Sequence, residues 1–314
     1  MKKLTIAALI LGASTAAHAQ SNVTVYGLVD LGLAHTSGKT TVERENHASR
    51  LGFKGSEDLG GGLAAIFQLE TEILADTGAA KGVLFERQAN VGFKGSFGTV
   101  YLGRTKNLVD GAQGRIEPFG ADGVIGKVDE PMMRVGVSSS RVNNAITYNS
   151  NSINGFVASA QYVLSEVSGA KNGLDLLATY DNGPVSLHFG YELAAQTAST
   201  TISQPKMFVV GGAFKIDALK LTAGYARGDT NLVATGKYKA FLLGAIYTVG
   251  QGDFKAVLGK QKQETNAVAS KETVREIGVG YDYHLSKRTD LYAYAGREKV
   301  TSATSYQTGI SHKF

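Results

Sequence analysis

The sequence contains no cysteine and no tryptophan, and only four of its 314 residues are proline. The absence of cysteine excludes a disulfide framework and thiolate metal sites. The scarcity of proline favours extended strands, because proline removes a backbone donor from a sheet ladder. After residue 19 no uninterrupted apolar run is long enough to cross a bilayer as a helix. These absences exclude a disulfide-rich domain and a bundle of membrane-spanning helices.

The N-terminal residues have the composition of a secretory signal peptide. Two lysines precede an apolar and small-residue run, and Ala17-His18-Ala19 has the small-x-small pattern of a cleavage site. The apolar part is shorter than the ~20 residues that a transmembrane helix needs. We therefore expect residues 1–19 to be a signal peptide and residues 20–314 to form a single exported domain.

Apolar residues alternate with polar or small ones through most of the remaining sequence. Near the start, Val23, Val25 and Val29 fall on one side of an extended segment. Asp30 falls on the other side, and the same pattern recurs at 63–70 and 185–191. A period of two is the period of a β-strand, whose successive side chains point to opposite faces. The 39 glycines, 14 tyrosines and 13 phenylalanines also favour strands joined by tight turns.

The connections between these segments alternate between short and long. The short ones lie at 57–61, 96–98, 182–184, 250–253 and 285–288, and the long ones at 35–47, 106–140, 196–204, 229–237 and 263–271. Short turns at one rim and long loops at the other are typical of a membrane β-barrel. The pattern predicts an all-β antiparallel barrel of about sixteen strands, with fourteen or eighteen left open, each of roughly ten residues.

A soluble all-β sandwich or barrel would also show alternation. Its inner face would have to pack as a core, and the second face of these segments is too polar for that. In a wide barrel the same polar face meets water. The formal net charge of +5 is small and spread along the chain, so the composition gives no indication of nucleic-acid binding.

Several stretches resemble the trimeric general porins of Gram-negative outer membranes, most closely their beta-proteobacterial and neisserial branch. The similar stretches are Val-Thr-Val-Tyr-Gly at 23–27, Ser-Arg-Leu-Gly-Phe-Lys-Gly-Ser-Glu-Asp-Leu-Gly-Gly-Gly-Leu at 49–63, Val-Gly-Phe-Lys-Gly-Ser-Phe-Gly-Thr-Val-Tyr-Leu-Gly-Arg at 91–104, and Gly-Ile-Ser-His-Lys-Phe at 309–314. They cover both ends and much of the first third of the chain. The middle resembles the family in rhythm more than in motif.

The resemblance implies an outer-membrane porin, a water-filled channel for passive diffusion of ions and small hydrophilic solutes. It implies sixteen strands, a homotrimer in outer-membrane lipid, and a long third loop, here 106–140, that folds into the lumen. It also implies that the C-terminal strand, ending at Phe314, carries the signal read by the barrel-assembly machinery.

The resemblance further implies a constriction in which acids of the third loop face arginines of the wall. The acidic candidates are Asp110, Glu117 and Asp122, and the basic candidates are Arg50, Arg87, Arg104 and Arg141. Alternation turns Arg50 and Arg141 inward, whereas Arg87 and Arg104 share the parity of lipid-facing neighbours. A bend at the end of the strand would turn Arg104 back into the lumen. Leu28 stands where such porins often carry a basic residue, which argues against strong anion selectivity.

Two other functions on the same scaffold remain open at this stage. Ser186 and His188 share a strand face, as a barrel hydrolase would require, but no motif supplies an orienting acid or an oxyanion hole. An adhesin would use long loops, and only 106–140 is long. The histidines and acids show no metal-ligand spacing, and no cofactor motif is present. We therefore expect no catalytic, metal or cofactor site.

Overall fold

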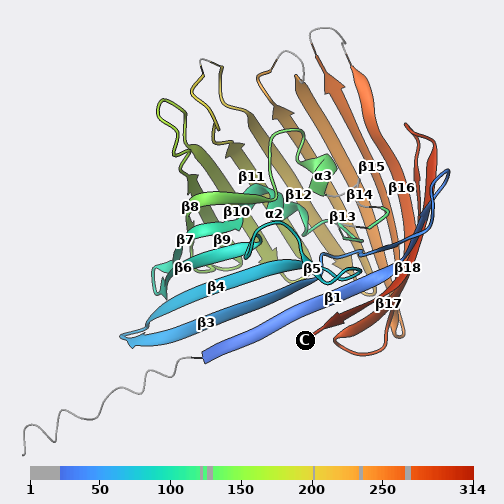
Figure 1. Ribbon diagram of the computed structural model, residues 1–314, viewed down its shortest axis with the longest axis horizontal. Coiled ribbons are helices and arrows are strands. Elements are labelled where there is room, and N and C mark those ends of the chain that lie inside the picture. Colours follow the sequence, from blue (N-terminus) through green and yellow to red (C-terminus); the bar gives the residue numbers. More distant parts are fainter. Residues whose placement is uncertain (1–21, 121–122, 126–129, 201, 233–235, 266–269) are drawn as a thin grey trace, which may run out of the picture.

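The structure is a computed structural model that describes residues 22–120, 123–125, 130–200, 202–232, 236–265 and 270–314. The signal peptide expected at 1–19 lies outside these residues. The described chain forms one antiparallel sheet that closes on itself (Figure 1). Its long strands are β1 (Asn22–Thr36), β3 (Arg50–Gly60), β4 (Leu63–Leu74), β6 (Gln88–Gly95), β7 (Gly98–Lys106), β8 (Arg141–Asn149), β9 (Phe156–Val163), β10 (Gly173–Asn182), β11 (Val185–Leu193), β12 (Lys206–Ile216), β13 (Leu219–Asp229), β14 (Lys237–Val249), β15 (Gly252–Glu264), β16 (Lys271–His284), β17 (Thr289–Glu298) and β18 (Ala303–Lys313).

Among the described residues these long strands number sixteen, as predicted, and two short strands are added at one rim. These are β2 (Val42–Arg44), which pairs with β1, and β5 (Ala79–Ala80), which pairs with β4. The barrel closes because β1 pairs with β18 along one edge and with β3 along the other. Closure leaves no row of unpaired backbone groups facing lipid, where nothing could satisfy them.

The predicted alternation is confirmed by the burial of successive side chains. In β1 the valines at 23, 25 and 29 are exposed on the outer wall, whereas Leu28 and Asp30 are buried inside. In β11, Leu187 and Phe189 face outward and His188 is buried. The outer wall is thus apolar and the inner wall carries most of the polar side chains, as a lipid-embedded, water-filled barrel requires. In the described part of the chain, no helix is both long enough and apolar enough to cross a membrane.

The described residues of the segment 107–140, which connects β7 and β8, pack against the inner wall. It contains two short helices, α2 (Leu108–Gln113) and α3 (Glu130–Met133), and Asn107 caps α2 by accepting from the Asp110 amide. Helix α2 contacts β9 to β12, and α3 contacts β14 and β15 (Figure 1).

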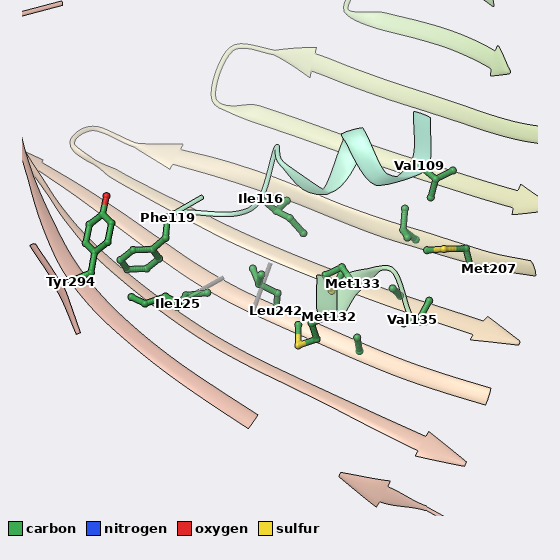
Figure 2. Packing of buried hydrophobic residues seen from close by; sticks show 14 of the residues in the cluster. Val109, Ile116, Phe119, Ile125, Met132, Met133, Val135, Met207, Leu242 and Tyr294 are labelled. Carbon is green, nitrogen blue, oxygen red and sulfur yellow. The ribbon is translucent and has the colours of Figure 1, made fainter. Parts of the chain in front are cut away.

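A buried apolar cluster forms between this segment and the wall (Figure 2). From the segment it includes Val109, Ile116, Phe119, Ile125, Met132, Met133 and Val135, and from the wall Met207, Val209, Ala226, Ala240, Leu242, Val257, Tyr292 and Tyr294. Glycines in the wall make room for the segment. A Cβ atom on Gly224 would lie 2.1 Å from Cδ1 of Ile116, so a larger residue there requires the Ile116 side chain to shift.

Candidate functional site

The inner face of the barrel has two cavities that meet at Lys106. The first, called here the charged cavity, has a volume of about 520 Å³. Its lining comprises His47, Ala48, Arg50, Glu72, Lys81, Glu86, Arg87, Arg104, Lys106, Gly114, Glu117, Pro118, Phe119, Gly120, Arg134, Ser140 and Arg141. The second has a volume of about 680 Å³, and its lining includes uncharged polar side chains such as Thr24, Gln68, Asn90 and Tyr101 together with the basic side chains Lys54, Lys106 and Arg115. All four predicted arginines therefore lie at one cavity.

Arg104 reaches the charged cavity through an irregularity in its strand. The pairing of β7 with β8 shifts register between Gly103 and Thr105, and Gly103 has a φ of +125°. Such a bulge re-aims the side chain that follows it. The guanidinium of Arg104 donates to the backbone oxygen of Glu86 and to Oδ1 of Asn143. The bend that sequence alternation required at this strand end is present.

Arg87 lies in the connection just before β6, so the strand alternation that seemed to turn it outward does not apply. Its Nε is 2.6 Å from Oε1 of Glu70, and its Nη1 is 2.7 Å from Oε2 of Glu72. Lys81 also pairs with Glu72. Burial alone would lower the pKa of Arg87, but the two carboxylates outweigh it and raise that pKa. Arg87 lines the cavity as a charged group whose partners are two inward carboxylates.

Arg50 and Arg141 stand at strand ends on the same side of the barrel. Arg50 begins β3 and pairs in register with Glu72 of β4. Arg141 begins β8, and its guanidinium donates to the backbone oxygens of Arg87 and Ser140. Both side chains line the charged cavity.

Glu117 is the acidic candidate that the structure brings to the charged cavity. Its two carboxylate oxygens accept from the backbone amides of Phe119 and Gly120, which closes the turn Glu117-Pro118-Phe119-Gly120. Burial raises the pKa of the Glu117 carboxyl above its ordinary range. The two backbone amides and the charges of Lys255 and His47 act in the opposite direction.

Of the other two acidic candidates, the structure describes only Asp110. Asp110 is buried and does not line it, because its carboxylate lies 2.5 Å from Nε of Arg134 and 3.5 Å from Nζ of Lys106. Its role in the structure is to hold the base of the segment. Asp122 lies outside the described residues.

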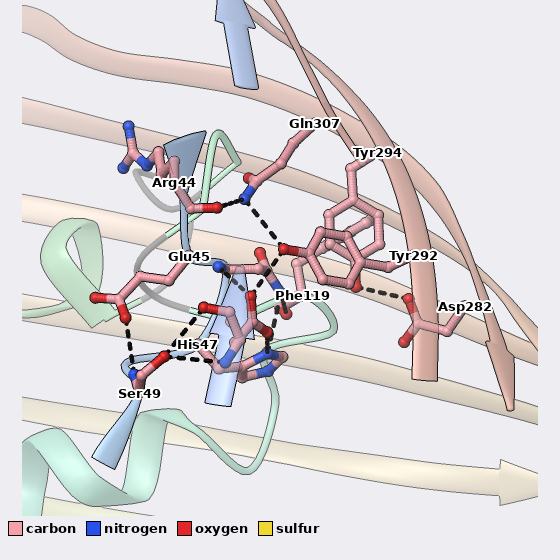
Figure 3. A network of polar contacts seen from close by, with 12 residues as sticks. Arg44, Glu45, His47, Ser49, Phe119, Asp282, Tyr292, Tyr294 and Gln307 are labelled. Carbon is pink, nitrogen blue, oxygen red and sulfur yellow. Dashed lines mark hydrogen bonds and ion pairs between the residues drawn. The ribbon is translucent and has the colours of Figure 1, made fainter. Parts of the chain in front are cut away.

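A polar network of the barrel wall holds the tip of the segment, here Phe119 and Val124 (Figure 3). Asp30, fully buried, accepts from the Tyr292 hydroxyl at 2.8 Å and from the Asn46 amide at 2.9 Å. The Asn46 side chain then donates to the backbone oxygen of Phe119 at 2.8 Å. Gln307 accepts from the Val124 amide at 2.9 Å. Strands β1, β17 and β18 and the connection between β2 and β3 therefore hold the segment in place together.

Sequence reasoning missed several charged residues of the cavity. These are Glu72, Lys81, Glu86, Lys106 and Arg134. One signal was available for Glu72, because the alternation at 63–70 turns Glu70 to the polar face and Glu72 has the same parity on β4. Lys81, Glu86 and Arg134 lie in connections whose path the alternation does not determine.

The pair considered for hydrolysis does not form a catalytic arrangement. The Ser186 hydroxyl donates to Oδ1 of Asp181 at 2.7 Å and accepts from Arg115 at 2.8 Å. Neither ring nitrogen of buried His188 has a hydrogen-bond partner among the described residues. Ser186 is thus not paired with the imidazole that would activate it. No group of three or more metal-ligating side chains occurs in the described part of the chain either.

Fold and cavities together define a transmembrane β-barrel with a polar, charged lumen. The sequence profile of the Gram-negative porin family matches residues 5–303, so the chain belongs to that family. It is 33% identical to outer membrane porin protein 32 of Delftia acidovorans and 27% identical to the major outer membrane protein P.IB of Neisseria lactamica, each over the whole of both chains. An anion-selective porin from Comamonas acidovorans has a similar structure, with a TM-score of 0.78 and 27% identity over 94% of this chain and all of the other.

These findings confirm the predicted family, the barrel and its location. The protein is a multi-pass β-barrel of the outer membrane, and it forms a channel for passive diffusion of solutes. The relatives that it matches are porins and not enzymes.

Proposed function

We propose that the charged cavity is the selectivity site of this channel and that it favours anions. The observation that carries the proposal is the charge of the lining, where seven lysines and arginines stand against three glutamates. Two of the seven, Lys106 and Arg134, pair with buried Asp110, and Arg87 pairs with two carboxylates. Arg104 donates to neutral oxygens, so its charge acts on a passing ion.

The physical basis is electrostatic focusing. Low-dielectric walls concentrate the field of a charged cleft, and rows of charge set the sign of the ion that a pore admits. Arg50, Arg104 and Arg141 lie on the wall, and Glu117 lies on the segment that faces them. Over a gap of one Debye length, ~8 Å in physiological salt, such a field remains partly unscreened. Polar solutes would orient their dipoles along it, and bulky apolar solutes would have to displace ordered water.

Anion preference is expected to be moderate. A structure similar to this one is described as anion-selective, which supports the sign. Leu28 is buried inside the barrel and carries no charge, so one basic position of the wall is missing. The preference therefore rests on the arginines at strand ends.

The test is the reversal potential in a planar bilayer under a salt gradient. The double variant Arg104→Glu, Arg141→Glu would leave five basic side chains against five acidic ones in the lining. We expect it to move the reversal potential from the anion side to the cation side. The matched control is Lys39→Glu with Lys299→Glu, which makes the same charge change at exposed positions outside both cavities. A double variant with unaltered anion preference would refute the assignment.

We also propose that the channel is a homotrimer and that its C-terminal strand is recognised by the barrel-assembly machinery, as resemblance to the general porins suggests. Conductance that closes in three equal steps would support the trimer, and closure in a single step would contradict it. Recognition of the C-terminal strand is supported by the position of Phe314 at the closing seam. Its backbone amide donates to the oxygen of Gly27, and its oxygen accepts from the Gly27 amide.

A further inference from the structure

The outer wall carries a band of basic side chains where β12 to β16 meet the long loops. In one row across the sheet, Arg227 of β13 pairs with Lys239 of β14, which pairs with Lys262 of β15. In the row below, Phe241 pairs with Lys260. These residues have the outward parity of exposed neighbours such as Phe241 and Leu243. Side chains opposite each other on adjacent strands lie close together, and like charges in that relation repel.

Acidic side chains compensate this band only in part. The band comprises six basic residues, Arg227, Lys237, Lys239, Lys260, Lys262 and Arg275, and three acidic ones, Asp229, Glu264 and Glu272. Lys239 lies 2.9 Å from Glu264, and Lys260 pairs with Glu272. Within the described residues, no ion pair joins Arg227 or Lys262 to a carboxylate. The charge excess faces away from the lumen and cannot serve solutes that pass through it.

Two hollows lie on this face, one below the other. The upper one has a volume of about 410 Å³ and is lined by Tyr225, Lys239, Ala240, Phe241, Lys260 and Lys262. The lower one has a volume of about 830 Å³ and an almost wholly apolar lining, which includes Val210, Leu221, Ala223 and Leu243. Tyr225 and Phe241 line both hollows, so the two hollows adjoin and form one continuous site. Small residues in the wall, among them Gly212, leave the depression open.

We propose that this face binds a phosphorylated lipid of the outer leaflet, with an acyl chain in the lower hollow and a phosphate on Lys239, Lys260 and Lys262. The lower hollow lies on the lipid-facing wall, where an acyl chain is the surrounding solvent. The upper one lies at the loop rim, which in such barrels is the extracellular side. Lysines at a membrane boundary extend their ammonium groups to the interface, where they form charge-assisted hydrogen bonds with phosphate.

Charge and shape together favour this occupant over a free anion or a second protein copy. A free phosphate would use the lysines and leave the apolar hollow unfilled. The spacing fits one amphipathic molecule, because Lys239 and Leu243 are four residues apart on β14, or about 13 Å along the strand. An anion across the row Arg227–Lys239–Lys262 would also relieve the repulsion between neighbouring cations.

The test is native mass spectrometry of the full chain refolded in detergent, with lipid A carrying two phosphates and with dephosphorylated lipid A as probes. The variant Lys239→Gln, Lys260→Gln, Lys262→Gln should bind the phosphorylated probe about a hundredfold more weakly than the unaltered protein, since each lysine contributes to phosphate attraction. The matched control Lys94→Gln, Lys215→Gln, Lys220→Gln removes three lysines near the short-turn rim and should bind normally.

A second variant tests the apolar half. Ala223→Phe fills the lower hollow from an outward position and should weaken both probes, with the lysines unchanged. Bilayer conductance like that of the unaltered protein shows that each variant is folded, so loss of binding cannot come from misfolding. Equal binding of the two probes by the unaltered protein would overturn the proposal. Unchanged binding of phosphorylated lipid A by the triple variant would also overturn it. So would the finding that a second copy of the chain covers this face and excludes lipid.

Discussion

Replacing Phe119 by alanine should release the tip of the segment 107–140 without opening the barrel. The Phe119 ring is 1% exposed, and its centroid lies 5.0 Å from that of Tyr294 in an edge-to-face arrangement. Lys255 stands 5.9 Å above the ring. Truncation of a buried phenylalanine costs about 3–5 kcal/mol. At ~1.4 kcal/mol per factor of ten, the equilibrium between docked and released tip shifts by about two to three and a half powers of ten.

The barrel hydrogen bonds do not involve the Phe119 ring, so the loss falls on docking of the segment. Single-channel recording should show larger or noisier currents, because the tip no longer holds a fixed position across the lumen. Resistance of the barrel to heat in detergent should be nearly unchanged. Phe97→Ala is the matched control, since Phe97 is 48% exposed at a short turn away from the segment. Steady currents of unaltered size from Phe119→Ala would refute the reasoning.

Three other predictions follow from single contacts. Burial raises the pKa of Glu117, so on lowering the pH this carboxyl loses its negative charge above pH ~4.3, the ordinary glutamate value. Anion preference should therefore rise as the pH is lowered through that range. Reversal-potential titrations measure this rise, and Glu117→Gln should not show it. Arg87→Ala leaves Glu70 and Glu72 buried without the guanidinium that pairs with both. The barrel in detergent should therefore lose about 3–5 kcal/mol of stability, measured by denaturant titration. An unshifted unfolding midpoint would count against a stabilising role of these ion pairs. Gly27→Val should impair closure, because a Cβ there would lie 2.3 Å from the Phe314 ring and 2.6 Å from the Arg50 backbone oxygen; a normal folded fraction on heat-modifiable gels would contradict this.

Strand alternation was enough to predict the barrel. A period of two determines which face each residue occupies once one face must meet lipid, and this holds for β1 and β11 without any knowledge of distant contacts. Closure of the sheet follows from the same constraint, since an open edge in lipid is not tolerated. The number of long strands does not, and the spacing of the connections left fourteen, sixteen or eighteen open.

Alternation fails where the chain leaves the ladder, and most of the site lies there. Arg104 follows a bulge at Gly103 that the sequence signals only as a glycine. Arg87 precedes its strand, so parity gave it the wrong face. Asp110 has the residue type of a constriction acid, yet its pairing with Arg134, twenty-four positions away in sequence, buries it below the cavity. Such pairings depend on how the segment folds back, and no local pattern encodes that path.

The inner wall is divided between two tasks, and this division explains the form of the channel. Strands β11 to β17 supply the glycine, alanine and apolar side chains against which the described part of the segment 107–140 packs, beside buried polar groups such as Glu276 and Asp282. Strands β3, β4, β6, β7 and β8 instead supply the arginines, glutamates and neutral polar groups that line the cavities. A segment held firmly against the apolar half leaves the water path along the charged half. On the proposed assignment, apolar packing on one side sets the width of the channel and the charges on the other side set its preference for ions.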